Sequence, residues 1–308
     1  MRLGVIFPHL EIGSGPKGVR EYAEAAEEFG YHHLSAYDHV VGASRAGHPG
    51  FTGPYDHTCL FHEPFVLFGF LAGLTKRIEF VSEIIILPQR QTVLVAKQAT
   101  EVDVLSGGRM RLGIGVGWNE VEYEALGMNF KDRGRRCEEQ IEVLRALFTR
   151  DLVSFKGKWH TITEAGLNPM PVRGSIPIWM GGGSARSRVI SKDEVAPRSE
   201  VKTDEIMRRI ARLADGWFPQ FGLDVDGGKE SQRMQGFLRE FGRDPKTFGI
   251  QGRISVKDYK TEADWKAIAA RWASWGATDI VVETMGAGLK TPRDHIEVIK
   301  RFKAVVGG

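Results

Sequence analysis

The sequence contains little cysteine: Cys59 and Cys137 are the only two among 308 residues, and they lie far apart. Two cysteines cannot form a disulfide framework, and no C-x-x-C or similar spacing indicates a zinc site. The N-terminal residues turn polar too soon for a secretory signal. Few cysteines and no disulfides are typical of proteins in the reducing cytoplasm, and we expect this protein to be cytoplasmic.

The sequence also lacks long apolar runs and a large excess of either charge. No run approaches the roughly 20 residues that a membrane-spanning helix needs. The 42 lysines and arginines are interleaved with 39 acidic residues, for a net charge of +3. They form no basic stripe of the kind that binds nucleic acid. We therefore expect neither a membrane nor a nucleic-acid partner, and a small organic molecule as the substrate.

Several well-known catalytic motifs are missing. No predicted strand leads into G-x-G-x-x-G with an acid about 20 residues later, and neither a Walker loop nor a G-x-S-x-G elbow occurs. His57, His62 and Glu63 lie near one another, but without the helical spacing of a zinc enzyme. His32 and His33 are neighbours on a predicted strand and point to opposite faces, so they cannot share one ion. The sequence predicts no metal site.

The chain instead alternates short apolar runs with longer segments of helical period. Strands are expected at residues 3–7, 33–36, 78–87, 111–115, 176–180, 216–218, 248–256 and 279–283. Helices are expected at 18–30, 64–75, 92–106, around 137–148, at 203–213, 231–241, around 265–272 and at 292–306. Eight strand–helix units predict an α/β fold, a (β/α)₈ TIM barrel, as one domain over residues 1–308. A doubly wound open sheet is the competing interpretation.

Three segments interrupt this alternation. Residues 42–58 are rich in Gly, Pro and His and are expected to form a loop, and 152–160 resembles a small hairpin. Residues 184–202 are polar and charged, between a strand and a helix. Because active sites of barrels lie at the C-terminal ends of the strands, we expect insertion segments at that face.

Polar and glycine-rich segments follow several predicted strands, at the face where a barrel carries its chemistry. Asp38 and His39 are adjacent, and a histidine beside a carboxylate is suited to proton transfer, although such a pair can also simply hold a loop. Gly181, Gly182, Gly183 and Ser184 would let backbone N–H groups approach a phosphate, or only form a tight turn. In the glycine-rich loop ending in Trp118 and Asn119, the indole could cover a planar ring and the amide could bind its edge.

One long run is more specific than these isolated features. It reads L-P-Q-R-Q-T-V-L-V-A-K-Q at residues 87–98, L-S-G-G-R at 105–109 and L-G-I-G-V-G-W-N-E at 112–120. The run closely resembles the luciferase-like monooxygenase superfamily, especially its oxidoreductases that depend on the deazaflavin coenzyme F420. Shorter matches at 37–39, 177–182, 214–217 and 285–288 extend the resemblance over nearly the whole chain.

The resemblance implies a TIM barrel with an insertion near its seventh strand, usually a homodimer, and a tricyclic ring bound in the barrel mouth. It implies a cis peptide bond between Glu83 and Ile84, and His39 beside the ring as proton donor or acceptor with Asp38 as its orienting partner. The resemblance assigns Asp38, His39, Glu83 and Ile84 to the ring, and Gly181, Gly182, Gly183 and Ser184 to the phosphate. The further residues that we predict to bind the cofactor are Ser82, Val116, Gly117, Trp118, Asn119 and Met180.

Two departures from the family pattern bear on substrate and cofactor. Glu83 stands where many relatives carry a small residue, and its carboxyl group would either bind a polar edge of the ring or point elsewhere. Trp118 stands where the sugar-phosphate dehydrogenase branch has a catalytic glutamate, which argues against that substrate. We predict hydride transfer between F420 and an unidentified organic substrate. The alternatives are an FMN-dependent monooxygenase that uses O₂ and a non-catalytic flavin-binding protein.

Overall fold

Eight parallel strands close into a barrel. The computed structural model describes residues 1–183, 188–191, 194–196, 200–220 and 226–307, with the backbone alone described between 188 and 202. The barrel strands are β1 (Arg2–Ile6), β2 (His33–Ala36), β3 (Glu79–Ser82) continued by β4 (Ile85–Ile86), β5 (Met110–Gly115), β8 (Ile178–Gly182), β11 (Gly216–Pro219), β12 (Gly249–Ser255) and β13 (Asp279–Glu283). The sheet runs β3-β2-β1-β13-β12-β11-β8-β5-β4, and pairing of β3 with β5 closes it. The predicted TIM barrel is confirmed, and the open-sheet alternative is wrong.

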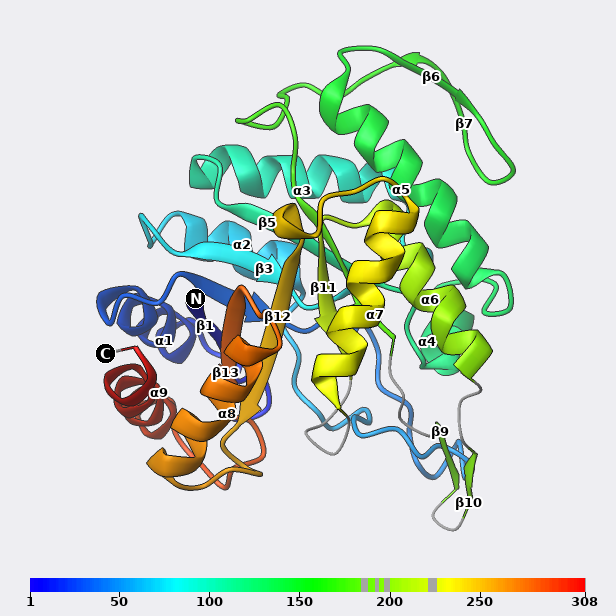
Figure 1. Ribbon diagram of the computed structural model, residues 1–308. Helices are drawn as coiled ribbons and strands as arrows, with labels where there is room; N and C mark the ends of the chain where they lie inside the picture. The colour runs from blue at the N-terminus through cyan, green and yellow to red at the C-terminus, as the bar shows by residue number, and fades with distance from the viewer. Residues whose placement is uncertain (184–187, 192–193, 197–199, 221–225, 308) are drawn as a thin grey trace.

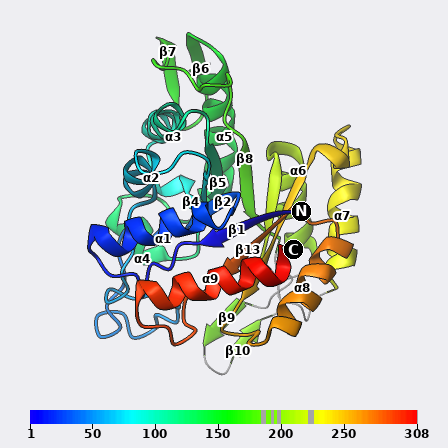
Figure 2. The ribbon, with the colours of Figure 1, turned by 90° about the vertical axis from the view of Figure 1, so that its left-hand side faces the viewer.

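Helices surround this barrel on the outside (Figures 1 and 2). They are α1 (Pro16–Glu28), α2 (Pro64–Ala72), α3 (Thr92–Ser106), α4 (Glu120–Ala125), α5 (Arg133–Thr149), α6 (Glu200–Leu213), α7 (Gly227–Glu240), α8 (Glu262–Ser274) and α9 (Pro292–Val306), with short 3₁₀ turns at Leu87–Gln89 and Pro245–Thr247. The predicted helices agree with these except at their ends and in the missed α4. The chain termini lie close together beside α9 (Figure 2).

Local sequence signals set the helix ends. Thr261 and Thr291 each form a capping box with the aspartate three residues later, which satisfies free N–H groups at the starts of α8 and α9. At the end of α3, Gly107 adopts φ 74°, a left-handed conformation that favours glycine.

Two hairpins extend from opposite ends of the barrel (Figure 1). A hairpin of β6 (Val153–Lys156) and β7 (Thr161–Ala165) begins where one was predicted, but its second strand lies wholly beyond the predicted end at residue 160. It precedes β8 and lies at the N-terminal end of the strands. The hairpin of β9 (Arg188–Ser191) and β10 (Glu194–Ala196) follows β8 at the predicted C-terminal face. The insertion expected near the seventh strand therefore follows the fifth instead.

The single long strand predicted for residues 78–87 is wrong. The structure breaks it into β3 and β4, and the peptide bond between Glu83 and Ile84 at the break is cis, as the resemblance implied. Hydrophobicity could not reveal the break, because apolar residues continue on both sides of it.

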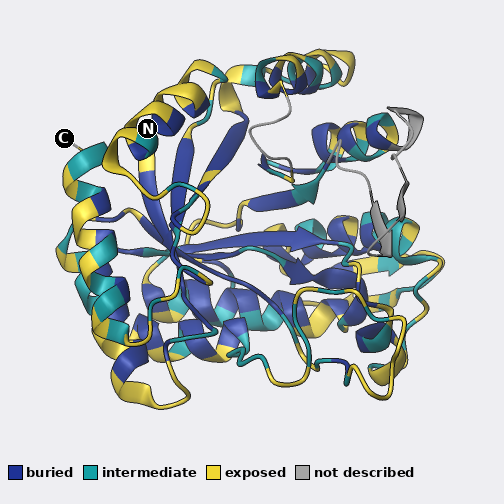
Figure 3. Cartoon of the chain, turned by 90° about the horizontal axis from the view of Figure 1, so that it is seen from below, coloured by how far each residue is buried: buried dark blue, intermediate teal, exposed yellow. Residues whose placement is uncertain are grey.

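Side chains alternate along the strands between two buried regions. Figure 3 shows the strands as buried and the helices as exposed on their outer sides. The larger core lies between strands and helices and includes Leu34, Leu112, Met180 and Ile254. Two smaller clusters lie inside the barrel: Val81, Trp179 and Phe218 with Ile84 against them, and Ile6, Tyr37, Val281 and Met285. The mouth of the barrel, at the C-terminal ends of the strands, carries polar residues instead.

Candidate active site

His39 lies at the C-terminal end of β2, surrounded by aromatic rings. Its ring centroid is 4.7 Å from that of Phe61, 5.0 Å from Tyr55 and 5.9 Å from Trp118. Beside it is a pocket of about 340 Å³ that Tyr55 and Phe61 also line. The side chain of His39 is 13% exposed, so its ring can be reached from the mouth of the barrel.

The partner of His39 is Glu122 and not Asp38, which corrects the predicted pair. Nδ1 of His39 lies 3.0 Å from Oε1 of Glu122, and the backbone N–H of Val40 donates to the same oxygen at 3.1 Å. Because a carboxylate only accepts, Nδ1 carries a hydrogen and Nε2 is left for exchange with a ligand. The Glu122 side chain is 1% exposed, so the imidazole is held by a buried carboxylate from α4.

Asp38 binds other residues instead of His39. Its carboxylate accepts from Nη2 of Arg90 at 2.8 Å and from the backbone N–H of Ile86 at 3.0 Å. Arg90 also donates to Glu63, at the start of α2, at 2.8 Å. Asp38 therefore joins the end of β2 to the segment after the cis peptide bond. It shapes the mouth and does not orient His39.

The residues at the break between β3 and β4 pack against glycines. The Ser82 hydroxyl donates to the carbonyl of Gly113 at 2.8 Å and accepts from its N–H at 2.9 Å, which joins two barrel strands and leaves Ser82 fully buried. A Cβ atom on Gly115 would lie 1.8 Å from Cδ1 of Ile84, and one on Gly181 would lie 3.3 Å from Cγ2. Ile84 occupies the space that these glycines leave, at the predicted ring site.

The Glu83 carboxyl group points to the opposite wall of the barrel. Its Oε2 accepts from Nε2 of Gln251, on β12, at 2.6 Å. Burial raises the pKa of Glu83 to about 7, against the opposing effect of the nearby Arg253. A carboxyl group that is partly protonated at neutral pH can donate as well as accept a hydrogen bond.

The loop after β5 has the predicted arrangement of exposed indole and buried amide. Trp118 is 44% exposed, and Gly117 before it adopts φ 66°. Asn119 caps α4 by accepting from the N–H of Val121, while its Nδ2 is buried without a hydrogen-bond partner among the described residues. The carbonyl of Val116 accepts from the hydroxyl of Tyr123. Among the described side chains of this loop, Asn119 has a buried donor without a partner.

The glycine-rich turn after β8 is described only in part. Gly182 and Gly183 have φ values of 148° and 71°, which a residue with a side chain rarely adopts. The indole N–H of Trp217 donates to the carbonyl of Gly182 at 2.8 Å. Met180 faces the core between strands and helices, so only its backbone could contact a ligand. Ser184 lies outside the described residues, and its role at a phosphate stays a prediction.

His9, after β1, is unsuited to carry a proton. It is fully buried, and burial lowers its pKa to about 3, aided by His62 and His39. Its ring packs against those of Phe7 and Phe61 at 5.0 and 5.1 Å. His9 is therefore neutral, and its ring nitrogens lie 3.2 Å from the backbone N–H groups of Tyr37 and His62.

Sequence reasoning missed a polar group on the wall formed by β2, β12 and β13. The hydroxyl of Tyr37 donates to Oε1 of Glu283 at 2.8 Å and accepts from Nη1 of Arg253 at 3.1 Å. A charged residue inside the predicted buried strand 248–256 was the signal that could have revealed Arg253. Glu122 gave no such signal, since it is one of several acids on a short helix.

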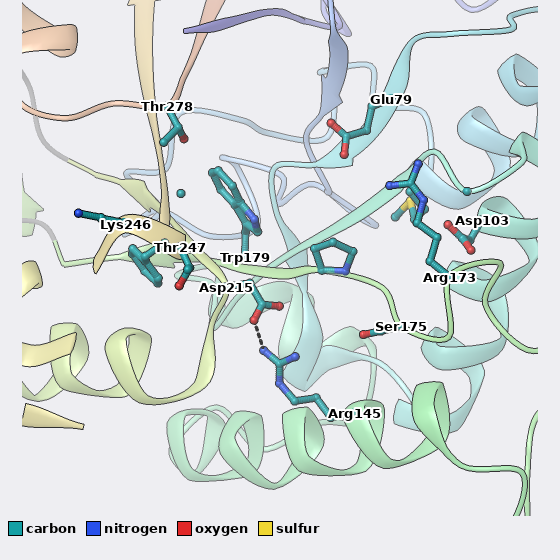
Figure 4. Close-up of a pocket in the computed structure, with 15 residues that line it drawn as sticks. Glu79, Asp103, Arg145, Arg173, Ser175, Trp179, Asp215, Lys246, Thr247 and Thr278 are labelled. Atoms are coloured by element: carbon teal, nitrogen blue, oxygen red, sulfur yellow. Dashed lines mark hydrogen bonds and ion pairs between the residues drawn. The ribbon is translucent and has the colours of Figure 1, made fainter. Parts of the chain in front are cut away.

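A second cavity, of about 620 Å³, lies at the opposite end of the barrel. Figure 4 shows Trp179 among the side chains around it and Arg145 paired with Asp215, at 3.0 Å. The lining residues Met110, Gly249 and Thr278 come from the N-terminal ends of strands or just before them. Because barrels carry their chemistry at the other end, we place the active site at His39.

No three His, Cys, Asp or Glu side chains are grouped as metal ligands in the part of the chain that the structure describes. Within those same residues, no helix is long and apolar enough to cross a membrane. Cys59 and Cys137 are both free thiols. The cytoplasmic location expected from them stays a prediction.

Comparison with known proteins agrees with this geometry. Residues 1–191 match the luciferase-like monooxygenase family. An uncharacterized protein of Mycobacterium tuberculosis is 34% identical over 248 residues, covering 79% of this chain and 76% of that protein. An FMNH₂-dependent dimethylsulfone monooxygenase of Pseudomonas putida is 30% identical over 129 residues, covering 41% of this chain and 35% of the relative.

Among solved structures, an F420-dependent secondary alcohol dehydrogenase, in complex with an F420–acetone adduct, superposes with a TM-score of 0.73. It covers 99% of this chain and 98% of its own at 15% identity, a level that shows the fold alone. The family match decides the class: the chain belongs to the luciferase-like monooxygenase family and is an oxidoreductase. The predicted family is confirmed.

Proposed function

We propose that the protein transfers a hydride between coenzyme F420 and a small organic substrate, with His39 moving the accompanying proton. The observation that carries this proposal is the imidazole of His39, held by the buried Glu122 at 3.0 Å and open to an aromatic pocket. A histidine fixed in this way can give or take a proton at neutral pH.

The mouth fits a planar ring. Ile84 offers a flat apolar contact beside Gly115 and Gly181, where no side chain intervenes. The buried Nδ2 of Asn119 has no partner among the described residues and would find one in an acceptor on the ring edge. A bound flavin or deazaflavin would supply the redox chemistry. The chain's own residues position it, exclude water and move the proton.

The second candidate is an FMN-dependent monooxygenase that uses O₂. One observation favours it: a relative with an FMNH₂-dependent monooxygenase activity in its name is 30% identical over part of this chain. The candidates differ in cofactor chemistry, because a deazaflavin lacks the ring nitrogen that supports oxygen activation.

The test is equilibrium binding of F420 and FMN to the purified protein, side by side. Preference for F420, followed by substrate reduction without oxygen consumption, is the expected result. Preference for FMN with oxygen consumption would replace the proposal by the second candidate. If neither cofactor binds, the ring site at Ile84 and Asn119 is wrong.

We also propose a homodimer formed through α2 and α3. These adjacent helices expose Val66 (71%), Phe70 (43%), Val93 (45%) and Leu94 (51%). Neighbouring exposed apolar side chains indicate a surface that another protein covers. Light scattering should show a dimer that Phe70→Glu converts to a monomer and that Leu152→Glu, on the β6–β7 side, leaves intact. A monomeric wild-type protein would refute the proposal.

A further inference from the structure

Arg253 is an exception among the barrel residues. In the fully described barrel strands, residues are buried or half-buried, with two exceptions. These are Arg2, the first residue of β1, and Arg253, in the C-terminal half of β12. The Arg253 side chain is 41% exposed, although both of its sequence neighbours are buried. An exposed arginine between buried neighbours needs a physical reason.

The direction of the strand gives that reason. A Cβ atom on Gly252 would lie 2.4 Å from the ring of Trp272 on α8, and Ile254 belongs to the core between strands and helices. Because successive side chains of a strand alternate, Arg253 points into the barrel. Because the Arg253 side chain points inward and is nevertheless exposed to solvent, it lines the open mouth of the barrel.

Arg253 is held in place but keeps hydrogen-bond donors free. Its Nη1 donates to the hydroxyl of Tyr37 at 3.1 Å, and its Nε lies 3.6 Å from Oε2 of Glu283, beyond hydrogen-bond distance. Among the described residues no group accepts from its Nη2. The Glu283 side chain is only 14% exposed, so the open side of this ion pair presents the guanidinium group.

Apart from Glu283, the titratable groups of this wall add little negative charge beside the guanidinium. Burial raises the pKa of Glu83 to about 7 and also raises the pKa of Glu11, so both carboxyl groups are more protonated than ordinary ones. Burial and then the Glu283 carboxylate raise the pKa of Tyr55 to about 12, so it stays neutral. Glu283 and Arg253 remain as the charged pair of the wall.

The guanidinium lies on the same side of the mouth as His39. Tyr37, which accepts from Arg253, is two residues before His39 on the same strand end. Tyr55 contacts the His39 ring at 5.0 Å and lies close enough to Glu283 and Arg253 to feel their charges. Tyr37 and Tyr55 therefore connect the surroundings of His39 with those of Arg253.

We propose that Arg253 binds the substrate and selects compounds that carry a carboxylate or a carbonyl group beside the reacting carbon. Arginine presents planar N–H donors that suit such oxygen acceptors, and a partly buried site strengthens the bond. Tyr37 and Glu283 hold the guanidinium in place, and His39 gives or takes the proton at the adjacent reacting group. This inference rests on the proposed function, because it takes the cofactor to occupy the glycine-lined side of the mouth at Gly115 and Gly181.

The test is calorimetric titration of the protein, loaded with F420 or FMN according to which one binds, with three probes of similar size. These are benzoate, benzyl alcohol and benzylamine. Benzoate should bind more tightly than the neutral alcohol, and the amine should bind worst. Arg253→Gln should weaken benzoate binding about 10- to 100-fold, the range for a hydrogen bond to a charged group, and Arg253→Lys should lie between.

The matched control is Arg2→Gln. Arg2 is similarly exposed, at 44%, and pairs with Glu79 at the other end of the barrel, so its loss should leave benzoate binding unchanged. Thermal melts of each variant establish that it is folded. Three results would overturn the proposal. The wild-type protein could bind benzylamine more tightly than benzoate, or fail to bind benzoate at concentrations on the order of 10 mM. Arg253→Gln could also bind benzoate as tightly as the wild type does.

Two further results separate this proposal from the proposed function. If Arg253→Gln weakens binding of the cofactor itself, the guanidinium contacts the ring and the substrate assignment is wrong. If the wild-type protein binds neither cofactor, the proposed function fails, and the same benzoate titration on the unloaded protein still measures whether Arg253 binds an oxygen acceptor.

Discussion

Arg111 and Arg253 both point into the barrel, from opposite ends, and their surroundings differ. At the N-terminal end of the strands, Arg111 is 3% exposed, pairs with Glu79 and with Asp279 at 3.2 Å, and lies 4.4 Å from the ring of Trp179. At the C-terminal end, in the mouth, Arg253 is 41% exposed and makes one hydrogen bond and one longer ion pair. The hydrogen-bond donors of Arg111 are taken up by other residues of the protein, whereas those of Arg253 are taken up only in part.

The comparison separates what stabilises the barrel from what it does. Enclosing Arg111 between two carboxylates and an indole leaves no free donor for a ligand, so this end serves the fold. The mouth instead retains unpaired groups at Arg253, His39 and Asn119, which a ligand can satisfy. We therefore expect substitutions at the mouth to affect ligand binding and turnover, and substitutions at the N-terminal end of the strands to affect stability.

The largest expected effect is on turnover, from His39→Ala. Loss of a positioned proton carrier should lower kcat about 10²- to 10⁴-fold, while the affinity for the cofactor and the melting temperature change little. Steady-state kinetics and a binding titration on the same preparation measure this separation. His48→Ala, at an exposed histidine of the 42–58 loop, is the control. Unchanged turnover in His39→Ala would exclude this role for His39.

The next effect is on stability, from Arg111→Met. Removing this cation leaves Glu79 paired with Arg2 alone, at 2.6 Å, and the buried Asp279 with Arg2 only at 3.9 Å. The free energy of unfolding should fall by about 3 kcal/mol, the lower end of the range for a broken buried pair. Arg253→Met removes a more exposed partner and should cost less than about 1 kcal/mol. Urea denaturation of both variants and the wild type measures the difference. Equal losses would mean that the two ends do not differ as their exposure indicates.

Glu83 links the mouth to stability through pH. Its pKa rises from 4.5 in the unfolded chain to about 7 in the fold, so the folded state holds its proton more tightly. The protonated form then contributes stability that is complete below about pH 4.5 and is lost as the pH rises through 7. Glu83→Gln cannot ionise, so its stability relative to the wild type should increase by about 1–3 kcal/mol between pH 5 and pH 8.

Urea denaturation at each pH tests this shift, with Glu28→Gln at an exposed carboxylate of α1 as the control. A relative stability that does not change with pH would show that Glu83 ionises in the fold like an ordinary carboxyl group.

The sequence predicted the elements well where a single physical signal defined them. The strands at 33–36 and 279–283 and the helices at 92–106 and 292–306 have the predicted bounds, because apolar runs and helix-ending Gly or helix-starting Pro residues coincide there. The break at Glu83 and Ile84 was visible only through family resemblance, since a cis peptide bond leaves no hydrophobic pattern.

The site was less predictable, because its contacts join distant segments. The prediction of Asp38 as the partner of His39 rested on adjacency, but adjacent side chains point in different directions, and the bond instead spans 83 residues to Glu122. The bond from Arg253 to Tyr37 spans 216 residues and depends on the closure of the barrel. Adjacency alone could not predict either contact, and the charge at Arg253 was only a signal that something polar faces inward.

Glu122 offers the smallest effect and the sharpest test of the corrected pair. Glu122→Gln keeps the size of the side chain but replaces a charge-assisted hydrogen bond to Nδ1 by a neutral one, which should lower kcat about tenfold and leave KM almost unchanged. Glu120→Gln, at an exposed acid of the same helix, controls for changes in α4. Asp38→Asn should instead loosen the contact with Arg90 and lower stability. If Asp38→Asn alone reduced kcat, the adjacent carboxylate would be the orienting group after all, and the geometry at Glu122 would be only structural.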